Sequence, residues 1–219
     1  MKQIIIYGWY CTIMLAAFFP AYMWYMQQYA WIWYVTTVIF ALLTYVPLVQ
    51  SYGMRWFYMI SSLAIVWLVI ESIGVLTCIP YGCFVYSEQL WPKLLSIVPY
   101  MLVCTWPPLV IGIWSIARKY YNIWHLRWII GAIWLVLVDL VLDPLAVLMW
   151  LWSYPSGWWW RWVPRSNFWW RLISGFIWMM LIDLILWDSY IDHKYYTAWL
   201  ITTLLFFISY GVWRTILSI

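Results

Sequence analysis

The sequence predicts an all-α fold, a polytopic integral membrane bundle of about seven transmembrane helices. Of the 219 residues, 68% are hydrophobic and 8% are charged, whereas a soluble globular domain usually has about 25% charged residues. The apolar residues lie in runs of roughly 20, which are long enough to cross a ~30 Å hydrocarbon core. Because the backbone must satisfy its own hydrogen bonds in lipid, such runs favour helices.

The predicted spans follow the apolar runs between turn residues and charges. The first run carries one lysine and no small-residue cleavage site, so we interpret it as a span rather than a signal peptide. The longer breaks fall at about 79–94 and 152–168 and lie on the same side of the membrane if there are seven spans. Little chain is left for anything else, so 1–219 is treated as a single transmembrane domain. The spans are placed at residues 4–26, 31–49, 57–78, 95–117, 124–151, 169–187 and 195–217.

The charge distribution indicates a membrane setting and gives a weak orientation. The net charge of +4 comes without a basic run of the kind that binds nucleic acid. Six basic residues fall on the side of the N-terminus and five on the other. This weakly favours a cytoplasmic N-terminus, with the two long breaks outside. We therefore expect a multi-pass protein of the cell (cytoplasmic) membrane, surrounded by lipid, with no nucleic-acid partner and an oligomeric state left open.

The four cysteines give no sign of a metal site. Cys78 and Cys83 lack CxxC spacing and have no nearby histidine. We expect all four cysteines to be small apolar residues in or beside helices.

Acidic side chains within or near the predicted spans are the strongest functional signal. A charge near the bilayer centre costs roughly 2.5–3.5 kcal/mol on insertion scales and is a functional candidate. Glu71 lies in the third span, Asp139 and Asp143 in the fifth, and Asp183 in the sixth. Since no Lys or Arg lies in the middle of these spans, we do not expect ion pairs to explain them. The alternative is a structural role, with the acids bound to backbone groups, Tyr hydroxyls or Trp N–H groups.

Asp139 and Asp143 are four residues apart, so they share one face of a helix. Two carboxylates so close resist double ionisation, and one of them is expected to keep a proton near neutral pH. Pro144 follows directly and predicts a kink in the helix.

Three segments carry a resemblance to a known family. They are ESIGVLTCIPYGCFVYSEQLWPKLL at 71–95, VDLVLDPLAV at 138–147 and VPRSNF at 163–168. In order and spacing they resemble the carotenoid biosynthesis membrane proteins that include the bacterioruberin-pathway carotenoid hydratases. The resemblance implies a polytopic, cofactor-independent lyase with a lipid-soluble carotenoid substrate. Its reaction would add water to the terminal isoprenoid C=C of an acyclic or monocyclic carotenoid, giving a tertiary alcohol.

The buried acids suit that chemistry. A trisubstituted alkene needs a strong proton donor, and a carboxylic acid kept neutral by apolar surroundings is one. One of Asp139 and Asp143 would protonate the alkene, while the other, or Glu71, would position the attacking water. No metal is expected in the site. The candidates for binding the substrate or water are Tyr81, Tyr86, Asn167 and Trp152.

Other functions remain open. A second carotenoid-modifying membrane enzyme would share these motifs, and a small proton-coupled transporter could use the buried carboxylates as a relay. A non-catalytic membrane scaffold would leave the DLVLDP motif unexplained. Transporters usually show inverted repeats or paired broken helices, and the sequence shows neither. It also lacks GxGxxG, P-loop and His-cluster motifs, so redox and phosphate chemistry lack support.

The chain has 24 tryptophans and only 9 glycines. Trp91, Trp150, Trp162 and Trp170 stand where the family pattern has glycine, and so does Cys78. Glycine is used where φ is positive or where backbones approach closely. The tryptophans could form interfacial belts, could belong to a diverged member with a reshaped pocket, or could be UGA codons that encode glycine in the source organism. TGG codons at the four positions would dismiss the third explanation, and TGA codons would support it.

Overall fold

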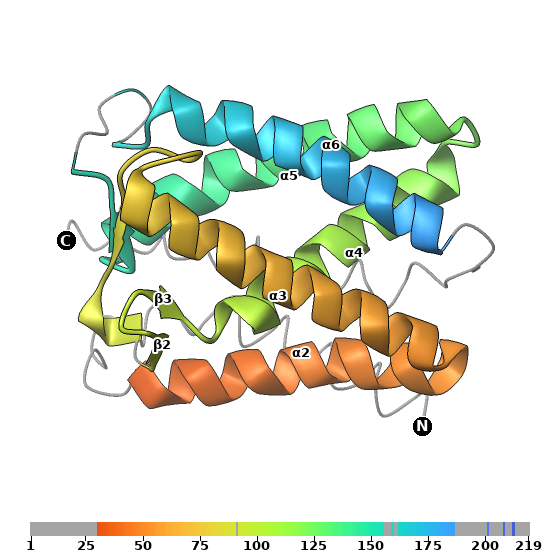
Figure 1. Ribbon diagram of the computed structural model, residues 1–219, viewed down its shortest axis with the longest axis horizontal. Helices are drawn as coiled ribbons and strands as arrows, with labels where there is room; N and C mark the ends of the chain where they lie inside the picture. Colours follow the sequence, from red (N-terminus) through yellow and green to blue (C-terminus); the bar gives the residue numbers. More distant parts are fainter. Residues whose placement is uncertain are drawn as a thin grey trace.

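The computed structural model describes residues 30–90, 92–155, 159, 162–186, 201, 208 and 212. Within them the chain is mostly helical, and Figure 1 shows the helices packed side by side as a bundle. The first and last predicted spans, 4–26 and 195–217, lie almost wholly outside the described residues. The α-helices are α2 (Ala30–Tyr52), α3 (Met54–Thr77), α4 (Leu102–Tyr120), α5 (Trp124–Leu148) and α6 (Arg165–Ile185).

Three of these helices, α3, α5 and α6, are long and apolar enough to cross a membrane. They agree within a few residues with the spans predicted at 57–78, 124–151 and 169–187. Large apolar side chains such as Ile65, Leu76 and Leu184 are exposed on their outer faces. Such faces are disfavoured in water and suit contact with lipid. The described helices therefore indicate membrane association.

The start predicted for the fourth span, at residue 95, is wrong. The strands β2 (Lys93–Leu94) and β3 (Val98–Pro99) pair as a short antiparallel hairpin, and α4 begins only at Leu102. Leu95 and Ser96 form its turn with φ of 48° and 60°. Hydropathy misplaced the boundary because this hairpin is itself apolar, with Val98 fully buried.

The two long breaks meet at one end of the bundle. The strand β1 (Val85–Tyr86), which precedes the 3-10 helix η2 (Glu88–Leu90), pairs antiparallel with β4 (Trp152–Ser153). Tyr86 lies opposite Trp152 in this register. The segments expected on the same side of the membrane are therefore in direct contact.

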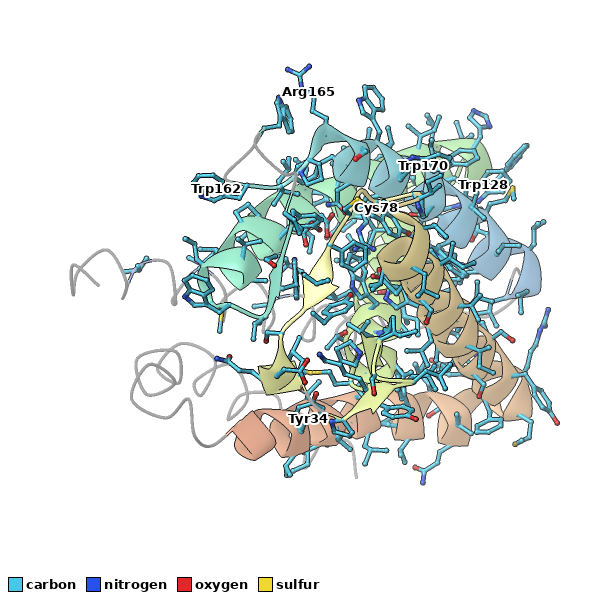
Figure 2. All side chains as sticks on the ribbon, turned by 60° about the vertical axis from the view of Figure 1, so that its left-hand side comes forward. Tyr34, Cys78, Trp128, Trp162, Arg165 and Trp170 are labelled. Atoms are coloured by element: carbon cyan, nitrogen blue, oxygen red, sulfur yellow. A yellow bond between two sulfur atoms is a disulfide. The ribbon has the colours of Figure 1, made fainter. Side chains whose placement is uncertain are left out.

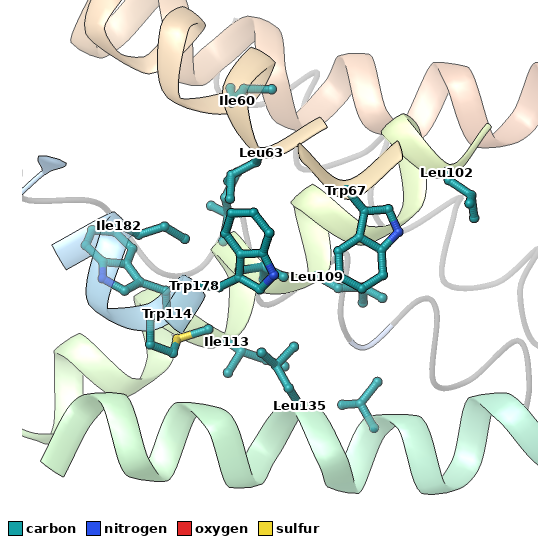
Figure 3. Packing of buried hydrophobic residues seen from close by; sticks show 14 of the residues in the cluster. Ile60, Leu63, Trp67, Leu102, Leu109, Ile113, Trp114, Leu135, Trp178 and Ile182 are labelled. Carbon is teal, nitrogen blue, oxygen red and sulfur yellow. The ribbon is translucent and has the colours of Figure 1, made fainter. Parts of the chain in front are cut away.

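Packing in the core relies on large aromatic side chains and on two glycines. Figure 3 shows Trp67, Trp114 and Trp178 packed among aliphatic side chains. Both glycines lie where α5 and α6 pack against each other. There a Cβ added at Gly175 would lie 3.3 Å from the Ala132 Cα, and one at Gly131 would lie 2.6 Å from the Met179 Sδ. Small residues at these positions let the backbones approach closely.

Three of the positions expected to hold glycine have a glycine-type backbone. Cys78, Trp150 and Trp162 have φ of 62°, 59° and 76°, a conformation that costs residues with a Cβ roughly 1–2 kcal/mol. The indoles of Trp150 and Trp162 are exposed, and Figure 2 shows Trp162 pointing away from the bundle. Trp170 differs because it lies inside α6, where no positive φ is required. Trp91 lies outside the described residues.

The prediction that every cysteine is only a small apolar residue is wrong for two of them. Cys78 and Cys83 form a disulfide across the turn that follows α3, with their Cα atoms 4.1 Å apart. The spacing of five residues gave no metal or redox motif, but the turn folds the chain back on itself. Cys104, in α4, has a free thiol.

Candidate active site

A cluster of charged and polar side chains is buried between α3, α5 and α6. Glu71 comes from α3, Asp139 and Asp143 from α5, and Asn167 and Arg171 from α6. Each of the five is at most 7% exposed. Burying charges is costly unless they are paired and hydrogen-bonded, so the contacts within the cluster decide how it can exist.

Arg171 provides the positive charge of the cluster. Its Nη1 donates a hydrogen bond of 3.2 Å to Glu71 Oε1, and its Nε lies 3.2 Å from Asp139 Oδ2 in an ion pair. The expectation that ion pairs do not explain the acids of the spans was therefore wrong for Glu71 and Asp139. The predicted span began at residue 169, which placed Arg171 at its edge, whereas α6 begins at Arg165 and buries Arg171 more than one turn inside.

Three aromatic rings surround the Arg171 guanidinium. Its Cζ lies 4.2 Å from the ring centroid of Tyr81, 4.4 Å from that of Trp106 and 4.8 Å from that of Trp67. Aromatic faces attract cations through their quadrupoles, most strongly where water is excluded. The rings and the two acids together hold a guanidinium that has lost its hydration.

Asn167 joins the two aspartates of α5. Its Nδ2 donates to Asp139 Oδ2 at 3.0 Å and also to Asp143 Oδ2. The Tyr154 hydroxyl donates to Asp143 Oδ2 at 3.2 Å. The spacing of four residues thus places both carboxyls on one helix face, where one amide holds them.

Tyrosines from the loops cap the cluster. Tyr86 donates a hydrogen bond of 2.9 Å to Glu71 Oε2, and the Tyr81 hydroxyl lies 3.5 Å from Ser174 Oγ. Burial, and then the charge of the nearby carboxylates, raises the pKa of both Tyr86 and Tyr154 well above its ordinary value. Their hydroxyls therefore remain protonated and act as donors to the acids.

The structure thus brings together six of the seven residues singled out from the sequence. The seventh, Trp152, contacts the cluster through the Tyr86 ring, with the centroids 6.0 Å apart. Sequence reasoning missed Arg171 and Tyr154. The burial of Arg171 depends on side chains from α3, α4 and α5 that surround it. The loop containing Tyr154 is brought to the site by the pairing of β1 with β4, which leaves no periodic signal in the sequence.

Asp183, the remaining acid in a predicted span, belongs to a separate structural contact. Its carboxylate accepts hydrogen bonds from the indoles of Trp114 and Trp128, at 2.9 and 3.0 Å, and from Arg127 at 3.1 Å. These partners come from α4 and α5 and tie both helices to α6. The ion pair with Arg127 shows that the expectation of no ion pairing was also wrong for Asp183, and these contacts support a structural role for this residue.

The chain matches, over residues 29–218, the sequence model of a family described as "carotenoid biosynthesis protein". The chain belongs to this family. It is also similar to the bisanhydrobacterioruberin hydratase of Haloarcula japonica, with 37% identity over 91 residues. That alignment covers 39% of this chain and 30% of the relative, so the chain matches under a third of its length. No solved structure matches the chain.

In this carotenoid biosynthesis protein, two acceptors of the cluster lack a partner among the described residues. They are Asp139 Oδ1 and Asn167 Oδ1, both buried. Buried polar atoms are normally hydrogen-bonded to protein or to ordered water. Two acceptors on side chains that already touch can together receive both O–H groups of one water molecule, or one hydroxyl of a ligand.

Proposed function

We propose that this protein is a hydratase, which adds water to the terminal isoprenoid C=C of an acyclic or monocyclic carotenoid to give a tertiary alcohol. The observation that carries the proposal is the buried pair of Asp139 and Asp143, whose Oδ2 atoms both accept from Asn167 Nδ2. Membership of the carotenoid biosynthesis family and similarity to a relative named as a hydratase support it.

The chemistry needs an acid and a base in close contact. Two buried carboxyls that share one amide nitrogen resist double ionisation, so the pair holds one acid and one carboxylate. The acid adds its proton to the less substituted alkene carbon and leaves a tertiary cation. The carboxylate then takes a proton from the water whose oxygen bonds to that cation. Glu71, paired with Arg171, adds negative charge that stabilises the cation.

The surroundings suit a lipid-soluble substrate. The cluster lies between helices whose outer faces are apolar, and a long polyene dissolves in the bilayer. The overall reaction joins an alkene and water without a change in total oxidation level, so the chemistry requires no redox cofactor. We place the protein in the cell membrane as a multi-pass protein.

Expression in a bacterial host that makes lycopene, followed by mass analysis of the pigments, tests this function. The wild-type chain is expected to produce pigments heavier by one water per modified end. Asp139→Asn and Asp143→Asn are each expected to lose this product by about 100-fold or more. Glu88→Gln is the matched control, because Glu88 is an exposed acid of η2. A different mass change would instead assign another carotenoid modification, and unchanged pigment with protein in the membrane would refute the proposal.

A further inference from the structure

The three acids of the cluster have different partners. Glu71 and Asp139 each lie within an ion-pair distance of 3.2 Å from Arg171. Between described residues, no ion pair within 4 Å involves Asp143, whose side chain accepts hydrogen bonds from the neutral side chains of Asn167 and Tyr154. A nearby cation favours the charged form of a carboxyl. The asymmetry therefore bears on which acid of the pair holds the proton.

We infer that Asp143 is the proton donor of the pair, and that Arg171 is a positioning residue that keeps Asp139 as the carboxylate. The inference rests on the proposed hydration and assigns a role to each acid. Both carboxyls accept from Asn167 Nδ2, and two carboxylates so close resist double ionisation, so the pair keeps one proton. The ion pair of Asp139 with Arg171 leaves that proton on Asp143.

Each step of the proposed hydration is then carried out by a named side chain. The proton of Asp143 bonds to the =CH carbon through the π electrons, which leaves a tertiary cation on the neighbouring carbon. A lone pair of the water oxygen forms the new C–O bond, and the water passes one proton to Asp139. The free Oδ1 of Asp139 and the Oδ1 of Asn167 are the acceptors that orient this water. Transfer of the proton from Asp139 to the neighbouring Asp143 restores the starting state.

Loss of the proton donor and loss of the carboxylate that accepts the proton of water leave different partial reactions. Without the donor, no cation forms. Without the carboxylate that receives the water proton, the cation still forms and can lose a proton from an adjacent carbon, which regenerates an alkene. In deuterated water, that return leaves deuterium in the recovered carotenoid. The label therefore separates the donor from the group that positions water.

The test uses the full-length protein in liposomes that contain lycopene and deuterated water, with mass analysis of both the hydrate and the recovered carotenoid. Asp143→Asn is expected to lose hydration by about 100-fold or more and to leave the carotenoid unlabelled. Asp139→Asn is expected to lose hydration but to label the recovered carotenoid. The reverse pattern, or labelling by Asp143→Asn equal to that of the wild type, overturns the inference. If the wild type forms no hydrate, the proposed function fails instead.

Arg171 is tested by the rescue of its charge. Arg171→Met removes the cation from Asp139 and is expected to lose hydration, whereas Arg171→Lys keeps the charge and is expected to form more hydrate than Arg171→Met. Equal activity of the two, with both recovered folded in the membrane, contradicts the positioning role. Should Asp143→Asn fail to fold, Asp143→Glu keeps an acid at this position. The Asp143→Glu variant must retain measurable hydration. If Asp143→Glu is folded but inactive while Asp139→Asn is active, the assignment of the donor is overturned.

Discussion

Asn167 on α6 donates a hydrogen bond to Asp143 on α5, 24 residues earlier in the chain. The same amide nitrogen also bonds to Asp139, so a single neutral side chain sets the relative position of the two acids. Glycine at position 175 and glycine at position 131 let the two helices approach closely enough for this contact. The geometry of the acid pair therefore depends on how α5 and α6 pack.

Replacing Asn167 should impair catalysis more than folding. In Asn167→Leu the two carboxyls lose their shared donor, and misplacement of reacting groups by about 1 Å can cost roughly 100-fold in rate. We expect a loss of hydrate of about that size, measured with the protein in liposomes. Ile177→Val, an exposed position on the same helix, is the control. An Asn167→Leu protein with wild-type activity would show that the amide does not organise the pair.

Gly175→Ala should destabilise the contact between α5 and α6. The new Cβ would lie 3.0 Å from Leu135 Cδ1 and 3.3 Å from the Ala132 Cα, and overpacking of this kind costs about 1–3 kcal/mol. The melting temperature in detergent should fall, and hydration should fall with it. Leu135→Val, added to Gly175→Ala, removes one of the crowded methyl groups and should recover part of the loss. No change in melting temperature for Gly175→Ala would show that the helices can separate at little cost.

Much of this architecture could be predicted from the sequence, because hydropathy reports burial in lipid directly. The positions of α3, α5 and α6 and the shared face of Asp139 and Asp143 follow from run length and helical period. Arg171 could not be assigned in the same way, since its burial depends on residues of three helices that surround it. The contact of Tyr154 with Asp143 depends on loop pairing, which leaves no periodic signal in the sequence.

The backbone conformations at Trp150 and Trp162 predict that glycine is the better residue there. Trp150→Gly and Trp162→Gly should each raise the stability by about 1–2 kcal/mol, because glycine adopts positive φ without strain. Trp170→Gly is the matched control: it lies inside α6 and should lower stability by about 1 kcal/mol. Thermal unfolding in detergent measures all three. If Trp150→Gly and Trp162→Gly destabilise as Trp170→Gly does, tryptophan is the residue that the fold requires.

Whether the gene encodes glycine or tryptophan at these positions can be determined directly from the natural protein. Glycine at positions 150 and 162 would appear in the peptide masses of protein isolated from the source organism, together with TGA codons in its gene. Tryptophan in those peptides would leave interfacial anchoring or divergence as the explanation for the composition.

The disulfide between Cys78 and Cys83 predicts which side of the membrane the joined loops face. Disulfides persist in oxidising compartments, so the end of the bundle with β1 and β4 should lie outside the cytoplasm, as the weak charge bias also predicts. In a variant that lacks Cys11 and Cys104, the protein on intact cells should react with an impermeant thiol label only after treatment with an impermeant reductant. Labelling that needs permeabilised cells would place this end in the cytoplasm.

The most direct test of the central claim is the origin of the oxygen in the product. Purified protein in liposomes with lycopene and oxygen-18-labelled water should place the label in a tertiary hydroxyl at the end of the chain, with no requirement for molecular oxygen. A hydroxyl whose oxygen comes from molecular oxygen, or a product without added oxygen, would contradict hydration by the acid pair.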